Sequence, residues 1–175
     1  MKKIKNYRLG ILGGSFDPAH IGHIKISKIA KKKYSLKKII WAITKKNPFK
    51  KNSTKSLSER IKYAKKINLN NKFISVDFFE NKINSNKTID LINYFKKKRK
   101  YKEIYFIMGA DNLIKFHKWN KWNEISSKCN ILVFDRNRYK SKSLESIAFK
   151  KYNKKGLEFI NFKKINISSS QLRKI

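Results

Sequence analysis

The 175-residue chain has the length of one ordinary domain, and its 40% hydrophobic and 13% aromatic content is enough for a packed core. No apolar run approaches the ~18 residues of a membrane-spanning helix, and the two Pro and six Gly exclude collagen-like or Pro/Gly-rich disordered chains. The one cysteine, Cys129, excludes a disulfide framework. Because no apolar stretch follows the first lysines as it would in a secretory signal, we expect a cytoplasmic protein.

The formal net charge of +34 raises the possibility of a nucleic-acid-binding protein. Only six of the 45 basic residues are Arg, however, and the lysines are spread along the chain with an excess of Ile and Asn. Nucleic-acid surfaces favour Arg for its bidentate geometry, whereas Lys, Ile and Asn share A- and U-rich codons. We therefore interpret most of the charge as solvated background and expect no specific nucleic-acid partner.

Apolar runs alternate with helical patterns along the chain. The first run, Tyr7–Leu12, leads into a glycine turn and then a helix that begins near Ala19, and Ser58 is the expected cap of the next helix. The remaining expected strands are 38–43, 73–76, 103–108, 130–134, 157–160 and 165–167, and the remaining expected helices are 88–98, 111–116, 122–126, 144–152 and a closing turn at 168–175.

Strands that read as continuous apolar runs and alternate with helices predict a parallel sheet covered on both faces. We find no repeat and no linker, so the sequence predicts a single α/β domain over residues 1–175, a Rossmann-like open parallel sheet. In such folds ligands bind beyond the carboxyl ends of the strands. The residues that follow each strand are therefore the candidates for function.

The segment after the first strand, from Gly13 to His23, combines groups that suit a polyphosphate. Two glycines allow a close approach of the backbone, and a helix N-terminus offers N–H groups and a positive dipole end. His20 and His23 are three residues apart, so both imidazoles lie on one side of that helix. A zinc site is the alternative for this pair, but no nearby cysteine or third histidine completes a ligand set.

This segment resembles the His-x-Gly-His signature of a nucleotidyltransferase superfamily, whose members transfer a nucleoside monophosphate from a nucleoside triphosphate to a second phosphate. Near the other end, Ile167 to Arg173 resembles the superfamily's Ile-Ser-Ser-Thr-x-x-Arg signature, with Ser170 in the Thr position. The resemblance implies that Gly13, Gly14, Ser15 and Phe16 line the ATP site with backbone. It also implies that Ser168, Ser169, Ser170 and Arg173 hold the β- and γ-phosphates.

A third segment indicates the branch of the superfamily. Gly109-Ala110-Asp111, followed by Phe116-His117-Lys118-Trp119, resembles the Gly-x-Asp and Phe-x-x-Trp pieces of the nicotinate-nucleotide adenylyltransferases. In that family the Asp helps to hold the nucleotides and the Trp packs on the pyridine ring, which assigns these roles to Asp111 and Trp119. His117 either assists phosphate binding or caps a turn, and we interpret Trp122 as a core aromatic.

Two shorter pieces fit the same family. The loop after the second strand carries an Asn-Pro step, so Asn47 is a candidate for substrate contact. Thr88 lies at a helix start, where its hydroxyl and the neighbouring N–H groups would receive the nicotinate carboxylate. Lys87 stands where the family has Tyr, so that half of the motif is missing, and a solvated lysine is the simpler expectation.

The implied reaction joins ATP and nicotinate mononucleotide into deamido-NAD and pyrophosphate. No side chain resembles a nucleophile, so we expect positioning and charge stabilisation by His20, His23 and Arg173. Mg²⁺ would bridge the phosphates with few protein ligands, and Asp17 would orient that ion or, as we prefer, cap the helix. Alternatives are a pantetheine-phosphate or nicotinamide-mononucleotide adenylyltransferase and, from another class, a basic RNA-binding protein; the sequence leaves the oligomeric state open.

Overall fold

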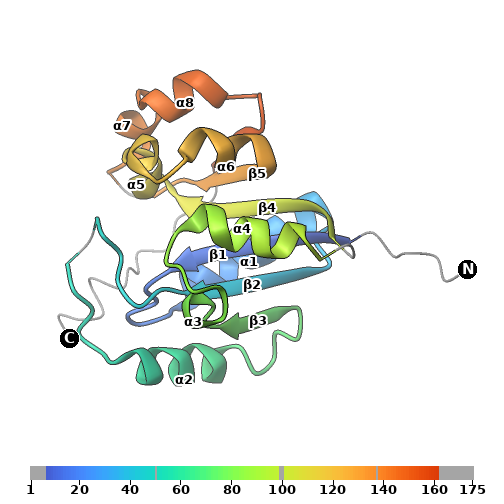
Figure 1. Ribbon diagram of the computed structural model, residues 1–175, viewed down its shortest axis with the longest axis vertical. Helices are drawn as coiled ribbons and strands as arrows, with labels where there is room; N and C mark the ends of the chain where they lie inside the picture. Colours follow the sequence, from blue (N-terminus) through green and yellow to red (C-terminus); the bar gives the residue numbers. More distant parts are fainter. Residues whose placement is uncertain (1–6, 50, 99–100, 137, 162–175) are drawn as a thin grey trace, which may run out of the picture.

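The computed structural model describes residues 7–49, 51–98, 101–136 and 138–161, and it contains one six-stranded sheet (Figure 1). All strands are parallel and lie in the order β3-β2-β1-β4-β5-β6. Their bounds are β1 Tyr7–Gly14, β2 Lys38–Ile43, β3 Ile74–Asp77, β4 Tyr101–Gly109, β5 Asn130–Phe134 and β6 Leu157–Ile160. This strand order confirms the expected Rossmann-like sheet.

Helices cover both faces of the sheet, as the apolar strands require. In Figure 1, α4 (Thr88–Lys96) lies in front of the sheet and α1 (Ile21–Tyr34) lies behind it. Buried residues of α4, α6 (Trp122–Lys128) and α8 (Ile147–Tyr152) pack into one core, and those of α1 and α2 (Leu57–Ile67) pack into the other. Short helices complete the list: α3 Glu80–Ile83, α5 Ala110–Leu113, α7 Lys140–Leu144 and a 3₁₀ turn at Phe116–Lys118.

The strand order reverses at β1, which is paired with β2 on one side and β4 on the other. The crossovers diverge at this point, and the space between them at the carboxyl ends of β1 and β4 is the usual ligand site of an open α/β sheet. β1 ends at Gly13 and Gly14, and β4 ends at Gly109. The fold therefore brings the glycine–histidine segment and the Gly-x-Asp segment to the same edge of the sheet.

Some expected boundaries are wrong for reasons that the side-chain contacts show. The cap of α2 is Ser56 rather than Ser58, because Ser56 and Glu59 satisfy each other's backbone N–H groups in a capping box. The helix expected at 144–152 begins only at Ile147, as α8, because Ser146 accepts the N–H of Phe149 and caps it, while the preceding α7 ends at Leu144. Helix α3 was not expected, and the elements expected at 165–167 and 168–175 lie outside the described residues.

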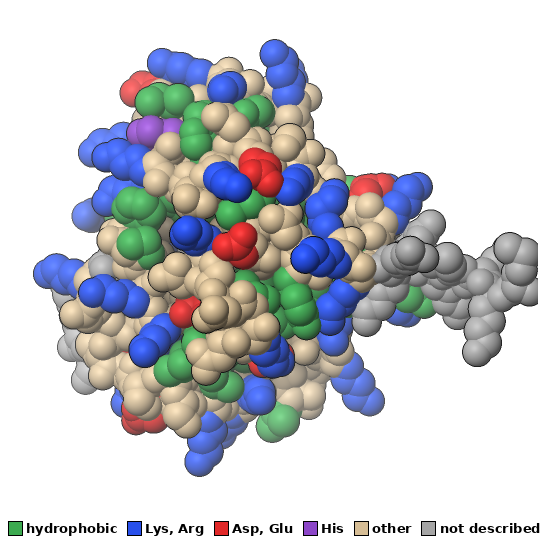
Figure 2. All heavy atoms as spheres, viewed as in Figure 1, with side chains coloured by type: hydrophobic (Ala, Val, Ile, Leu, Met, Phe, Trp, Pro, Cys, Tyr) green, Lys and Arg blue, Asp and Glu red, His purple; other side chains and the backbone are tan. Residues whose placement is uncertain are grey.

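Lysine and arginine side chains are scattered over the visible face of the molecule rather than gathered into one patch (Figure 2). On this face the basic groups do not follow the single path along which a nucleic-acid surface concentrates them. None of the helices in the described ranges combines the length and the apolar character needed to span a membrane.

Candidate active site

The two histidines of the first motif cap the helix that carries them. His20 is the N-cap of α1, and its Nδ1 accepts the N–H of Gly22 at 3.1 Å. The backbone N–H of His20 donates to Nδ1 of His23, also at 3.1 Å. Since Nδ1 is an acceptor in both rings, Nε2 carries the proton of each neutral imidazole. The capping box thereby fixes the tautomer of both rings, whose centroids lie 3.9 Å apart.

This capping changes one expectation from the sequence. The N–H groups at the start of α1 were expected to face a ligand, but Gly22 donates to the His20 ring and the N–H of His23 donates to the His20 carbonyl at 2.9 Å. These two first-turn donors are therefore used locally. Each imidazole carries a donor of its own, Nε2–H, at this helix start.

His20 is a neutral group at physiological pH. Burial and, to a smaller extent, the nearby positive charge of Arg136 together lower its pKa from 6.5 to about 4. A neutral imidazole with its proton on Nε2 donates a hydrogen bond without adding a full positive charge. The positive charge beside His20 therefore belongs to Arg136, a residue that the sequence had not singled out.

A bed of aromatic rings supports His23. Its ring lies 4.8 Å from that of Phe16, which in turn stacks on Trp41 at 4.9 Å. Ser27 accepts the indole N–H of Trp41 at 2.9 Å and donates to the carbonyl of His23 at 2.8 Å. Phe16 and Trp41 are buried, so the imidazole rests on a rigid surface. Such support limits the orientations that His23 can adopt.

The backbone between β1 and α1 departs from ordinary geometry. Phe16 has a φ of 49°, a left-handed conformation that is strained for a bulky residue. The sequence indicated a turn at Gly13 and Gly14, but these two glycines are the last residues of β1. A Cβ at Gly13 would lie 3.2 Å from the Phe106 ring, so glycine there allows the neighbouring strand to pack. Ser15 follows directly after the strand.

Asp17 does not cap α1, in contrast to the preferred expectation. Its side chain is fully buried and accepts the backbone N–H groups of Thr54 at 2.6 Å and Lys55 at 3.3 Å, with the Thr54 hydroxyl at 3.2 Å. A carboxylate that accepts several N–H bonds is well satisfied. Asp17 thus joins the loop after β1 to the end of the loop that precedes α2.

At the carboxyl end of β4, Asp111 forms an ion pair with Arg136, which follows β5 after one intervening residue. The distance from Asp111 Oδ2 to Arg136 Nη1 is 2.7 Å, and the two side chains are 10% and 35% exposed. A Cβ at Gly109 would lie 2.6 Å from Asp111 Oδ1, so the glycine gives this carboxylate its room. The structure places both groups at the reversal of the strand order.

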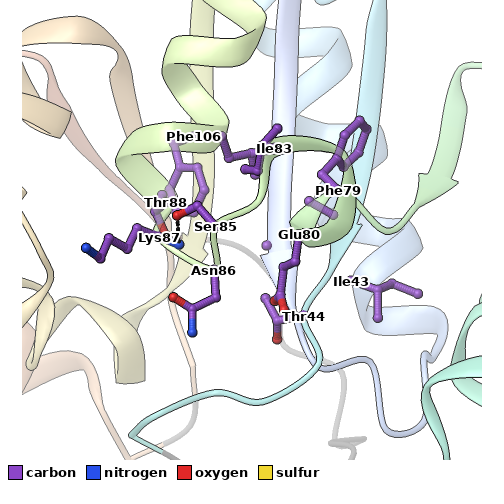
Figure 3. Close-up of a pocket in the computed structure, with 13 residues that line it drawn as sticks. Ile43, Thr44, Phe79, Glu80, Ile83, Ser85, Asn86, Lys87, Thr88 and Phe106 are labelled. Atoms are coloured by element: carbon purple, nitrogen blue, oxygen red, sulfur yellow. Dashed lines mark hydrogen bonds between the residues drawn. The ribbon is translucent and has the colours of Figure 1, made fainter.

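A narrow cleft of about 40 Å³ lies beside this point (Figure 3). Thr44 at the end of β2 and Glu80 of α3 line one wall, and Thr88 with Phe106 lines the other. Thr88 is the first residue of α4, as the sequence predicted, while the Lys87 side chain points away from the cleft in Figure 3.

Asn47 lies in the loop after β2. Its Oδ1 accepts the N–H of Phe49 at 2.9 Å, so this oxygen stabilises the loop itself. The side-chain acceptor that the sequence offered for substrate is therefore engaged within the loop.

The aromatic segment after α5 packs against the core. Trp119 is partly buried and meets the rings of Phe106 at 6.0 Å and Phe116 at 5.3 Å edge-on. Trp122 contacts Phe116 and Tyr152 in the same manner, which confirms its interpretation as a core aromatic. Nδ1 of His117 is buried, and the described part of the chain offers it no hydrogen-bond partner. Ser168, Ser169, Ser170 and Arg173 lie outside the described residues.

The fold and these side chains define an α/β protein whose candidate ligand site lies at the switch point of its parallel sheet. The family model for cytidylyltransferase-like proteins matches residues 11–175. A probable nicotinate-nucleotide adenylyltransferase of Pelagibacter ubique is 66% identical over 171 residues, which cover 98% of this chain and 94% of that protein. A protein of the same name from Bradyrhizobium sp. strain ORS 278 is 38% identical over 130 residues, with coverages of 74% and 67%.

Among solved structures, the nicotinic acid mononucleotide adenylyltransferase of Plasmodium falciparum in complex with NaAD matches with a TM-score of 0.72. It is 21% identical, and the match covers 97% of this chain and 83% of that one. This likeness supports the fold. With the family match and the close relatives, the conclusion is that the chain belongs to the cytidylyltransferase-like family.

Proposed function

We propose that this chain transfers AMP from ATP to nicotinate mononucleotide, with deamido-NAD and pyrophosphate as products. The proposal follows the relatives named probable nicotinate-nucleotide adenylyltransferase, which are 66% identical over 98% of this chain and 38% identical over 74% of it. The observation in the structure that carries it is the pair of imidazoles, His20 and His23, that form the capping box at the start of α1. We place the reaction in the cytoplasm, as the sequence led us to expect.

In the proposed reaction a phosphate oxygen of the mononucleotide attacks the α-phosphorus of ATP in line. The new P–O bond forms as the bond from the α-phosphorus to the bridging oxygen breaks, and pyrophosphate leaves with that oxygen and the electron pair. No protein nucleophile is required, so catalysis consists of positioning and charge stabilisation. The Nε2–H groups of His20 and His23 would donate to the phosphate oxygens on which charge accumulates.

The other ATP contacts are proposed from position and resemblance. The backbone of Gly13, Gly14, Ser15 and Phe16 would line the ATP site, and Arg136 would supply positive charge beside His20. Gly109 and Asp111 would hold the nucleotides at the end of β4. Ser168, Ser169, Ser170 and Arg173 would hold the β- and γ-phosphates.

For the mononucleotide we propose contacts around the cleft of Figure 3. Thr88 at the N-terminus of α4 would receive the nicotinate carboxylate, where the helix dipole favours a negative group. Trp119 would pack on the pyridine ring, Asn47 would contact the mononucleotide, and His117 would assist phosphate binding.

We treat Mg²⁺ as part of the ATP substrate. The residues of the described ranges include no group of three or more His, Cys, Asp or Glu side chains that could hold a metal. The nearest carboxylates are already used, because Asp17 accepts loop N–H groups and Asp111 pairs with Arg136. A largely hydrated ion on the phosphate oxygens is the arrangement that this donor set favours.

An acceptor panel tests the proposal. The protein is incubated with MgATP and, separately, with nicotinate mononucleotide, nicotinamide mononucleotide and phosphopantetheine, and pyrophosphate release is measured for each. We expect the highest kcat/KM with nicotinate mononucleotide. A higher value with either other acceptor would replace the proposed substrate, and RNA binding with a steep salt dependence but no pyrophosphate would overturn the enzymatic proposal.

A further inference from the structure

We propose that Arg60 is a positioning residue that holds the loop after β1 and the loop after β2 in a fixed relation, so that the two substrates bind cooperatively and in line. This inference rests on the proposed function, in which the first loop lines the ATP site and the second lies beside the mononucleotide. Arg60 touches neither substrate. It would act through the backbone that does.

The guanidinium of Arg60 donates four hydrogen bonds to backbone carbonyls. Nη1 donates to the carbonyls of Ser15 at 2.6 Å and Thr44 at 2.8 Å, which follow β1 and β2 respectively. Nη2 donates to the carbonyl of Lys45 at 3.1 Å, and Nε to that of Lys55 at 3.2 Å. One side chain therefore joins the ends of two adjacent strands and the far end of the second loop.

The same loop is held from its other side by two carboxylates. Glu80 accepts the N–H of Lys45 at 3.1 Å, and Asp17 accepts the N–H of Lys55 at 3.3 Å. Each of these two lysines thus has its N–H bound to a carboxylate and its carbonyl bound to Arg60. The loop that carries Asn47 is fixed at both ends by these contacts. Because Glu80 also lines the cleft of Figure 3, the contacts lead directly to the mononucleotide side.

Because Arg60 is buried, its charge depends on the hydrogen bonds that the loop carbonyls accept. Arg60 is only 3% exposed, and no described carboxylate lies within ion-pair distance of it, so its charge is stabilised by carbonyl dipoles and by the nearby charges of Asp17 and Glu80. A buried charge is tolerated only where its hydrogen bonds are made, so the carbonyls must stay in place around the guanidinium. A displacement of either loop would break these bonds, and the side chain therefore resists independent movement of the two loops.

Lysine cannot reproduce this arrangement. Its ammonium is a single point with three donors, whereas the planar guanidinium directs its donors along fixed, divergent directions. Only six of the 45 basic residues of this chain are Arg. At position 60 the planar guanidinium supplies a hydrogen-bonding geometry that a lysine, the common basic residue here, lacks.

Three variants separate positioning from simple stability. Arg60→Met removes the donors, Arg60→Lys keeps the charge without the fork, and Lys62→Met, which removes a charge from an exposed residue of the same helix, is the matched control. For each we would measure the melting temperature, kcat, KM for both substrates, and the affinity of a non-hydrolysable ATP analogue with and without nicotinate mononucleotide. All assays would be run well below the melting temperature of the variant.

We expect Arg60→Met to lower kcat by about 10²-fold, since small misplacements of reacting groups have effects of this size. We expect nicotinate mononucleotide to lower the Kd of the ATP analogue by about fivefold or more in the wild type and to leave it almost unchanged in Arg60→Met. Arg60→Lys should stay closer to Arg60→Met than to the wild type, and Lys62→Met should match the wild type in every measurement. Should Arg60→Met fail to fold, Arg60→Lys supplies the same comparison.

The inference would be overturned by a folded Arg60 variant that has a lower melting temperature but a wild-type kcat and a wild-type effect of the mononucleotide on the affinity of the ATP analogue. Such a result would show a structural role only. If the wild type forms no deamido-NAD, the proposed function fails instead. The analogue still tests the arginine in that case, because equal affinities in the wild type and Arg60→Met would overturn its role at the ATP loop.

Discussion

The neutrality of His20 can be tested by its effect on stability as the pH falls. Its pKa is about 4 in the folded chain and 6.5 in the ordinary, unfolded state. Protons therefore bind the unfolded chain more readily throughout this interval, and acidification favours unfolding. The stability that neutral His20 contributes is complete above pH 6.5, is lost progressively between pH 6.5 and 4, and changes no further below that. The sign would be opposite for a histidine stabilised in its charged form.

The magnitude follows from the size of the shift. A difference of about 2.5 between the two pKa values corresponds to roughly 3 kcal/mol as an upper limit. Because His20 is only partly buried, solvent screening reduces this, and we expect a loss of about 1–2 kcal/mol in the free energy of unfolding. His20→Asn is the informative variant, since Asn is an effective N-cap and keeps α1 capped while it removes the titrating ring.

The assay is urea unfolding of the wild type and His20→Asn at closely spaced pH values from 4 to 7.5. Carboxylates that titrate in the same range contribute equally to both proteins and cancel in the difference. We expect the difference in unfolding free energy to change across the interval and to be constant above it. A difference that stays constant throughout, or an NMR titration of the His20 ring with its midpoint near 6.5, would refute the burial argument.

Three further substitutions address individual contacts. His23→Ala should lower turnover by at least ~10²-fold, equivalent to about 2.7 kcal/mol of transition-state stabilisation, and a turnover within threefold of the wild type would remove His23 from the mechanism. Trp119→Ala should raise KM for the pyridine nucleotide far more than KM for ATP, and equal increases would contradict ring packing. Gly109→Ala places a Cβ 2.6 Å from Asp111 Oδ1 and should displace its ion pair with Arg136, raising KM for ATP by about tenfold; an unchanged KM would argue against a nucleotide contact by Asp111.

The sheet was predictable because its strands are buried on both faces. After a polar first residue, each of the runs at 38–43 and 130–134 is apolar throughout, and such runs mark central parallel strands. The glycines at the ends of β1 and β4 could then be assigned to the carboxyl edge of the sheet from the sequence alone. The order of the strands needed the structure, since it depends on which crossovers go to which side.

The details that sequence could not supply depend on contacts between distant residues or on competing local partners. Asp17 precedes a helix, as a capping residue would, but its partners are Thr54 and Lys55 and no periodicity connects these segments. His20 takes the capping position because its own ring accepts the Gly22 N–H. Histidine is an uncommon cap, so propensity alone assigns this role to the aspartate.

The few arginines of this chain carry more information about the site than their number indicates. Scarce Arg argues against a nucleic-acid surface, but it does not make each arginine part of the same solvated background as the lysines. In the structure, Arg60 donates to four carbonyls around the site and Arg136 pairs with Asp111. Scarcity is an imperfect guide, because Arg8 forms an exposed pair with Glu103 away from these loops.

These assignments divide the electrostatic work of the site between two kinds of donor. Neutral imidazoles add directional donors whose positions the capping box fixes, and they do so without the mutual repulsion that two imidazolium rings 3.9 Å apart would experience. The full positive charge comes from Arg136, and burial, with a smaller contribution from that same charge, keeps His20 neutral. A phosphate bound between them would gain from both, because the attraction to the guanidinium requires no protonation step and the imidazole donors are available over the whole physiological pH range. The pH dependence of turnover near neutrality should then reflect the ionisation of the substrate phosphate rather than that of His20.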